Sequence, residues 1–137
     1  MEEAEIYRKI SYYRQQIQVY DDEIRKLNLE AAKLYELSSD LMSVQSQFEF
    51  KLSQRRSRLS LLSACDINQK LVGNIHSRTS SFLYGYQCEN AYSGIFTAQE
   101  EVRNKIDEIE QRIASVRSSI LHCQEQISIL GGQLARL

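Results

Sequence analysis

The fold is decided by residues 102–137, which read VRNKIDEIEQRIASVRSSILHCQEQISILGGQLARL. Alternating steps of four and three residues along this stretch meet no charged side chain and mostly large apolar ones. An apolar residue every 3.5 positions keeps one stripe facing a neighbouring helix, so this stretch predicts one helix of a left-handed coiled coil. The positions are Val102, Ile106, Ile109, Ile113, Val116, Ile120, Cys123, Ile127, Leu130, Leu134 and Leu137.

The first half of the chain carries the same spacing. Most of its stripe is large and apolar, and the exceptions are Ala31, Ser38, Gln45 and Arg55. Each half therefore offers the other the neighbour that it needs, which predicts an antiparallel pair. The stripe consists of Ile6, Ile10, Tyr13, Ile17, Tyr20, Ile24, Leu27, Ala31, Leu34, Ser38, Leu41, Gln45, Phe48, Leu52, Arg55, Leu59 and Leu62.

We therefore predict an all-α fold, a long antiparallel two-helix coiled-coil hairpin that forms a single domain. With the reversal near residue 70, the numbers of facing residues sum to about 140. This register sets Ile6 beside Leu134 and Leu34 beside Ile106. The expected parts are arm one at 3–64, a turn at 65–76, arm two at 77–131 and a short tail at 132–137.

Several breaks in the helical pattern are expected. The segment 71–74, Leu-Val-Gly-Asn, offers the freedom of a reversal, with Leu71 and Gly73 as the turn motif near 66–76, and Asp66 could cap a helix start. Serines, a threonine and Gly85 interrupt 77–93, where a kink is expected. The pair Gly131–Gly132 is expected to loosen the last turn.

Composition fits such a fold. Proline is absent and glycine occurs five times, and both residues disfavour helix interiors. The net charge of −1, from 17 basic and 18 acidic residues, gives no global support for nucleic-acid binding. Residues 51–80, however, carry six basic residues against one acidic residue. This basic segment either meets an acidic partner or is a solvated end of the hairpin.

The sequence offers little for catalysis or metal binding. Its two histidines, His76 and His122, are not adjacent to a nucleophile or carboxylate constellation, and no phosphate loop or zinc motif occurs. We expect no enzyme activity and no cofactor. Three unpaired cysteines fit a reducing cytoplasm, and Cys123 is expected to be a buried thiol in the stripe. No apolar run is long enough to insert into a membrane, and the acidic N-terminus does not fit a signal peptide.

More apolar residues are present than one helix pair can bury. Residues beside the stripe in arm one and in the facing part of arm two would remain exposed unless another helix covered them. We expect these residues and their stripe neighbours to bind a partner through spaced apolar anchors. They are Leu34, Tyr35, Leu37, Leu41, Met42, Val44, Phe48, Phe50, Phe82, Leu83, Tyr84, Tyr86, Tyr92 and Phe96.

With these features the chain resembles the small helical partners of LXG polymorphic toxins in the type VII secretion systems of Firmicutes, distant relatives of the Trp-x-Gly secreted helical hairpins. The central Trp-x-Gly turn would correspond to Leu71-Val72-Gly73, which keeps the glycine and lacks the tryptophan. An aromatic-x-x-x-acid pattern occurs at Phe96–Glu100. The resemblance implies a chaperone or targeting partner that binds the helical N-terminal domain of the toxin, often with a second small helical protein. Such a protein either stays in the cytoplasm or leaves with the toxin.

Two other functions stay open on the residues alone. A structural coiled-coil protein would self-associate as a dimer or tetramer, with Ser38, Gln45 and Arg55 fixing the register. A nucleic-acid-binding hairpin would use the basic segment and bind with a steep dependence on salt. Its contacts would be Arg55, Arg56, Arg58, Lys70 and Arg78.

Overall fold

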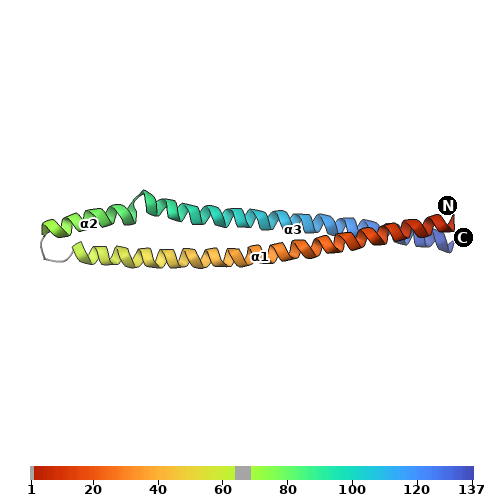
Figure 1. Ribbon diagram of the computed structural model, residues 1–137, viewed down its shortest axis with the longest axis horizontal. Coiled ribbons are helices and arrows are strands. Elements are labelled where there is room, and N and C mark those ends of the chain that lie inside the picture. Colours follow the sequence, from red (N-terminus) through yellow and green to blue (C-terminus); the bar gives the residue numbers. More distant parts are fainter. Residues whose placement is uncertain (1, 64–68) are drawn as a thin grey trace. The chain divides into compact units, whose positions relative to one another are not determined.

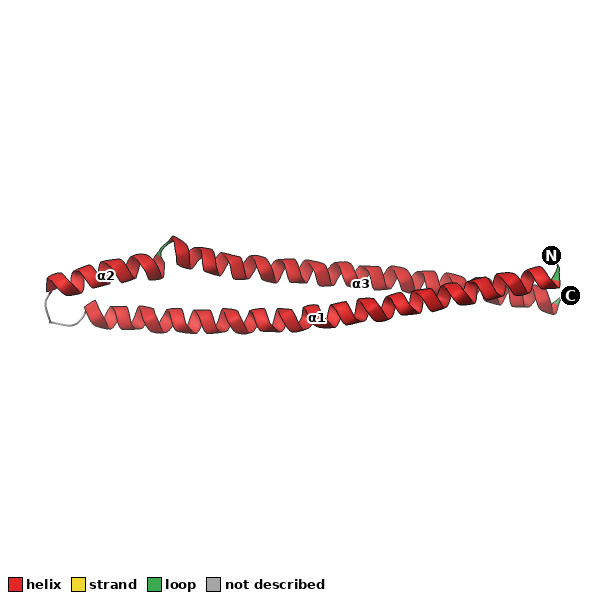
Figure 2. Ribbon diagram, in the orientation of Figure 1, coloured by secondary structure: helices red, strands yellow, loops and turns green. Residues whose placement is uncertain are grey.

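The computed structural model describes residues 2–63 and 69–137, and it is an all-α helical hairpin. It contains three helices in the described residues: α1 at Glu3–Ser63, α2 at Gln69–Tyr84 and α3 at Tyr86–Ala135 (Figure 2). The predicted arm one, 3–64, matches α1 closely. The predicted arm two is divided into α2 and α3.

The chain forms two compact units, which we describe separately. The terminal unit comprises Met1–Tyr35 with Asn104–Leu137, and the central unit comprises Glu36–Arg103. In the terminal unit the first part of α1 lies antiparallel to α3, with both chain ends together (Figure 1). In the central unit the rest of α1 lies beside α2 and the first turns of α3.

The core of the terminal unit is the predicted stripe. One cluster joins Ile6 and Ile10 of α1 to Leu130 of α3, and Leu134 packs against it. This confirms that the start of α1 faces the end of α3, as the predicted register requires. A second cluster joins Ala31 to Ile109 and Ile113, and Leu34 packs against it. The thiol of Cys123 is buried and free, as expected from its stripe position.

An ion pair adds to the terminal core from the surface. The Arg112 guanidinium of α3 donates to Glu23 Oε1 of α1 through Nε at 2.8 Å and Nη2 at 2.7 Å. Both side chains are largely or partly solvated, so the pair contributes at most about 1 kcal/mol to stability. Its main effect is to favour the antiparallel register.

The central unit has a thinner core. Its buried apolar side chains are Leu59 of α1, Leu83 of α2 and Val102 of α3, among the side chains that the structure describes. Between the helices Gln99 Nε2 donates to Gln45 Oε1 at 2.7 Å in a partly buried position. A buried polar pair of this kind is satisfied only in one alignment, so it fixes register at some cost in stability. The sequence predicted a register role for Gln45 between copies of the chain, whereas this contact lies within one chain.

The predicted turn motif is wrong in its described part. Leu71 and Gly73 lie inside α2, which begins at Gln69, and no described glycine has a positive φ. A single glycine costs only about 1 kcal/mol within a helix, which neighbouring residues with good helix propensity can offset. The remainder of the predicted turn, including Asp66, falls on residues 64–68, outside the described residues.

The expected kink is present at Gly85, which separates α2 from α3. A Cβ built on Gly85 would lie 2.0 Å from the backbone oxygen of Ser81. The close approach, rather than an unusual φ, therefore requires glycine at this bend. Immediately after it, the amide of Glu89 donates to the Gly85 oxygen at 3.2 Å and begins the hydrogen bonding of α3.

The C-terminal prediction needs a smaller correction. Helix α3 continues through Gly131 and Gly132 to Ala135, four residues beyond the expected end at 131. Leu130 is buried and Leu134 packs on the first cluster, so contacts with α1 hold this last turn in place.

Substitution by alanine is expected to change stability in opposite directions at Gly85, the bend, and at Gly73, inside α2. Gly85→Ala should lower the free energy of unfolding by about 1–3 kcal/mol, because the added methyl meets a backbone oxygen that cannot move away freely. Gly73→Ala, whose Cβ meets nothing within 4 Å, should raise it by roughly 0.5–1 kcal/mol through helix propensity. Urea unfolding monitored by circular dichroism measures both, and equal effects would contradict the close-approach explanation.

Candidate partner-binding site

The predicted binding residues differ sharply in exposure. Most are exposed, and the largest fractions are 76% for Tyr86 and 63% for Met42 and Phe50. Leu34, Leu41 and Phe48 are half-buried, in keeping with their stripe positions. The exposed members are Tyr35, Leu37, Met42, Val44, Phe50, Phe82, Tyr84, Tyr86, Tyr92 and Phe96.

Leu83 is the exception among the residues predicted to lie beside the stripe. Its side chain is 3% exposed, so it belongs to the core of the central unit and not to the exposed surface. The bend at Gly85 explains the error, because it shifts the phase of the apolar pattern between α2 and α3.

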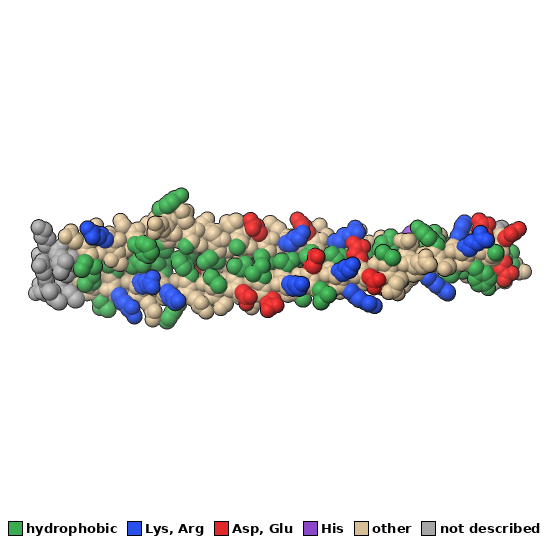
Figure 3. All heavy atoms as spheres, viewed as in Figure 1, with side chains coloured by type: hydrophobic (Ala, Val, Ile, Leu, Met, Phe, Trp, Pro, Cys, Tyr) green, Lys and Arg blue, Asp and Glu red, His purple; other side chains and the backbone are tan. Residues whose placement is uncertain are grey.

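The two units bury apolar residues very unequally. Of the twelve buried apolar side chains in the described residues, nine lie in the terminal unit and three in the central unit. The described residues of the central unit also expose eleven large apolar side chains. Figure 3 shows hydrophobic side chains at its surface, with Lys and Arg side chains over the last part of α1. Among its described residues, the central unit therefore exposes more large apolar side chains than it fully buries.

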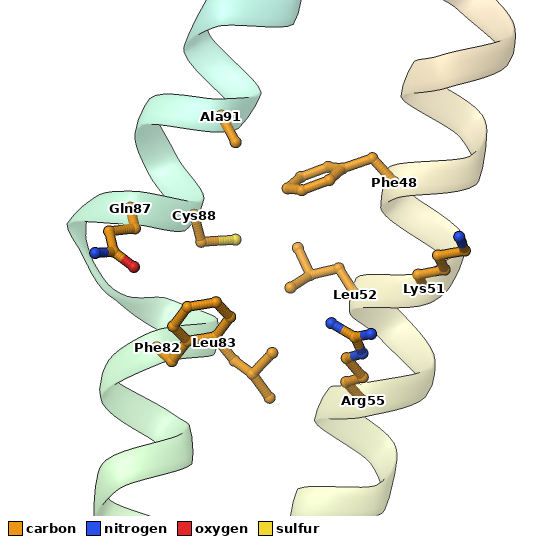
Figure 4. A pocket seen from close by; sticks show the side chains of 9 residues that line it. All are labelled: Phe48, Lys51, Leu52, Arg55, Phe82, Leu83, Gln87, Cys88 and Ala91. Carbon is orange, nitrogen blue, oxygen red and sulfur yellow. The ribbon is translucent and has the colours of Figure 1, made fainter.

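A pocket of ≈ 200 Å³ opens between the helices of the central unit (Figure 4). We call it the Phe48 pocket. The Phe48 and Leu52 side chains reach into it from α1, and the Cys88 thiol faces them from α3. Its other lining residues are Lys51 and Arg55 of α1, Phe82 and Leu83 of α2, and Gln87 and Ala91 of α3.

A second hollow lies on the opposite side of the helix pair. We call it the Tyr92 groove, because Tyr92 lines both of its parts, one of ≈ 470 Å³ and one of ≈ 350 Å³. Leu52 and Cys88 line both this groove and the Phe48 pocket, so they form the wall between them. The apolar surface that the sequence predicted as one patch is thus divided between two flanks. The other residues that line the Tyr92 groove are Glu49, Ser53, Arg56, Ser57, Ser60, Tyr84, Glu89, Ser93 and Phe96.

Arg56, and not the predicted Arg55, lies in the seam between the helices. The predicted stripe contained Arg55, but Arg55 is exposed and Arg56 is partly buried. The Arg56 guanidinium donates from Nη2 to the backbone oxygen of Leu83 at 2.9 Å and stacks 4.2 Å from the ring centre of Tyr84. Spacing alone could not choose between the two arginines, because each lies three or four residues from both Leu52 and Leu59.

Tyr92 is held by a hydrogen bond across the central unit. Its hydroxyl donates to Glu49 Oε1 at 2.6 Å, and its ring lies 6.2 Å from that of Phe48. The bond to the Glu49 carboxylate is the largest cause of a raised Tyr92 pKa, and the negative charge of Glu49 adds to it. In the terminal unit the Tyr35 hydroxyl donates to Glu110 Oε1, which raises the pKa of Tyr35 in the same way.

Stability is expected to fall at alkaline pH as these tyrosines ionise. A folded pKa raised above the unfolded value of about 10 gives a stabilising contribution that is complete below that value and is lost as pH rises through the folded pKa. Tyr92→Phe should therefore lose less stability above about pH 10 than the parent. Chemical denaturation over this pH range measures the difference. Tyr86→Phe, at a side chain 76% exposed, is the control, and the same alkaline slope in all three proteins would contradict the prediction.

The described residues contain no group of three or more His, Cys, Asp or Glu side chains that could hold a metal ion. None of the described helices is long and apolar enough to span a membrane. Comparisons of the chain with family models, curated proteins and solved structures gave no match.

Proposed function

We propose that this chain is a non-catalytic binding protein that associates with the helical N-terminal domain of an LXG toxin, as a chaperone or targeting partner for type VII secretion. The specific partner comes from the resemblance carried by the two heptad arms. The observation that supports partner binding is the imbalance in the central unit, which buries three apolar side chains and exposes eleven in the described residues.

Helical surfaces of this kind suit a helical partner. A third or fourth helix laid along α1 and α3 would cover the apolar side chains beside the seam, as in a helix bundle. The free protein leaves this apolar area exposed to water. Covering it would stabilise the complex by about 25 cal/mol per Å² of apolar area buried. The toxin domain, and a second small helical protein with it, would supply such helices.

Co-expression with the helical N-terminal domain of an LXG toxin tests the proposal. A defined complex is expected, and Met42→Asp or Phe96→Asp should abolish it while leaving the helix content unchanged, because both side chains are exposed in the free protein. Leu29→Asp, at an exposed residue of the terminal unit, is the matched control and should still bind. A stable monomer that forms no complex with the toxin domain would contradict the proposal.

The alternative function is a structural coiled-coil protein that self-associates through the same surface. Its support is the exposed apolar surface of the central unit, which a second copy would cover. Light scattering on the isolated protein separates the two functions. A discrete dimer or tetramer that dissociates with Met42→Asp and does not bind the toxin domain would favour self-association.

A further inference from the structure

The Phe48 pocket has an apolar interior and a basic rim. Its interior is formed by side chains such as Phe48, Leu52 and Phe82, while Lys51 and Arg55 stand at its edge on α1. At ≈ 200 Å³ it is smaller than the roughly 300–1,000 Å³ usual for small-molecule sites. Its size instead suits one or two large apolar side chains that project from another helix, as a knob enters a hole.

The basic residues at this rim lack acidic partners. Neither Lys51 nor Arg55 makes an ion pair within the part of the chain that the structure describes. The residues three and four positions away from Arg55 along α1 are Lys51, Leu52, Arg58 and Leu59, so its charged neighbours on the helix carry the same sign. Like charges at these spacings destabilise a helix by about 0.2–0.5 kcal/mol per pair.

Some basic residues elsewhere have acidic partners, whereas others, such as Arg8 and Arg117, make no ion pair within the described residues. Lys9, Arg25 and Lys105 each pair with an acid three or four residues away, and Arg112 pairs with Glu23 of the facing helix. What distinguishes the pocket is the local charge, because residues 51–62 hold four basic side chains and no acidic one beside an apolar pocket. An acidic partner would relieve their mutual repulsion when it fills the pocket.

From this coincidence we infer that the Phe48 pocket receives an acidic amphipathic helix, whose large apolar side chains enter the pocket while its Asp or Glu residues face Lys51 and Arg55. The inference rests on the proposed function and adds to it the flank of the central unit and the chemistry of the partner segment. A second copy of this chain fits less well, because a symmetric contact through this flank would bring the same basic residues of both copies together.

Nucleic acid is also a poorer match for this site. The wall of the pocket is almost wholly apolar and would leave a phosphate backbone without polar contacts inside it. The unpaired cations at the rim are few, whereas nucleic-acid sites present extended basic surfaces to many phosphates.

Two helix-stapled peptides of about 20 residues provide the probe. Both carry leucines along one face, and the edges of that face carry glutamates in one peptide and lysines in the other. Fluorescence anisotropy at low salt should show binding of the glutamate peptide only. Lys51→Glu combined with Arg55→Glu should weaken that binding about tenfold or more and confer binding of the lysine peptide. Binding of both peptides alike, binding of neither at millimolar concentration, or tighter binding of a labelled oligonucleotide would overturn the inference.

A matched pair of substitutions locates the binding flank without changing charge. Ala91→Phe fills the Phe48 pocket from an exposed position on α3, whereas Ser93→Phe enters the Tyr92 groove on the other side. Ala91→Phe should abolish binding of the glutamate peptide and weaken binding of the toxin domain, whereas Ser93→Phe should leave binding of the glutamate peptide unchanged. If only Ser93→Phe blocks the toxin domain, the proposed function stands and this inference fails. If the unmodified protein binds no toxin domain, the proposed function itself fails.

Discussion

Ile109→Ala is expected to lower the free energy of unfolding by about 2–4 kcal/mol and the thermal midpoint by roughly 10 °C. Ile109 is 4% exposed and belongs to the cluster with Ala31 and Ile113 in the terminal unit. The alanine would remove apolar contact and leave a cavity opposite Ala31, whose small side chain cannot fill it. Chemical and thermal unfolding followed by circular dichroism measure the loss.

Ile129→Ala is the matched control for this substitution. Both isoleucines lie in α3, but Ile129 is 54% exposed. Alanine has a higher helix propensity than isoleucine at either site, so this gain cancels when the two variants are compared. The control should change stability by no more than about 0.5 kcal/mol. If both variants lost equal stability, the heptad stripe would not be the core of the terminal unit.

The heptad stripe could be predicted because its signal is local and repeated. Every apolar position from Val102 to Leu130 in the predicted stripe is buried or half-buried, since a sustained 3.5-residue period leaves one face for a neighbouring helix. The pairing of Ile6 with Leu134 followed from the similar lengths of the two arms. Length and period together were therefore sufficient for the fold class and for the register of the terminal unit.

The start and the phase of α2 could not be predicted in the same way. A glycine is compatible with a turn, a bend or a helix interior, so the pattern predicted a kink within 77–93 but could neither place Gly73 inside α2 nor single out Gly85 as the bend. What distinguishes Gly85 is its close approach to the Ser81 oxygen, which exists only once the backbone is folded. Leu83 and Cys88 consequently lie five residues apart in sequence yet line the same pocket.

The Phe48 pocket also depends on information absent from either helix alone. The sequence identified Phe48 and Phe82 as binding residues and noted the basic segment around Arg55. It did not indicate Cys88 or Ala91, because small side chains become significant only where the facing helix leaves space above them. The division of the apolar surface into two flanks could not be predicted for the same reason. It depends on the side of Leu52 on which each residue lies in the folded structure.

Arg56→Ala is expected to lower the free energy of unfolding by about 2 kcal/mol, a large effect for an arginine. Helix α2 ends at Tyr84, so the carbonyl groups of its last turn lack the usual amide partners within the helix. The Arg56 guanidinium supplies a donor to the Leu83 oxygen at 2.9 Å and brings positive charge to the negative end of the helix dipole. Its stacking on Tyr84 adds about 0.5–1 kcal/mol.

Two further substitutions separate these contributions from charge alone. Arg56→Lys keeps the positive charge but lacks the planar group that donates to the carbonyl and stacks on the ring, so we expect it to lose about half as much stability as alanine. Arg55→Ala removes a basic residue one position away, at an exposed site, and should change stability by less than about 0.5 kcal/mol. Urea unfolding of the three variants gives the order directly. Equal losses for Arg55→Ala and Arg56→Ala would mean that the carbonyl contact at the end of α2 does not stabilise the central unit, and that only the density of positive charge matters there.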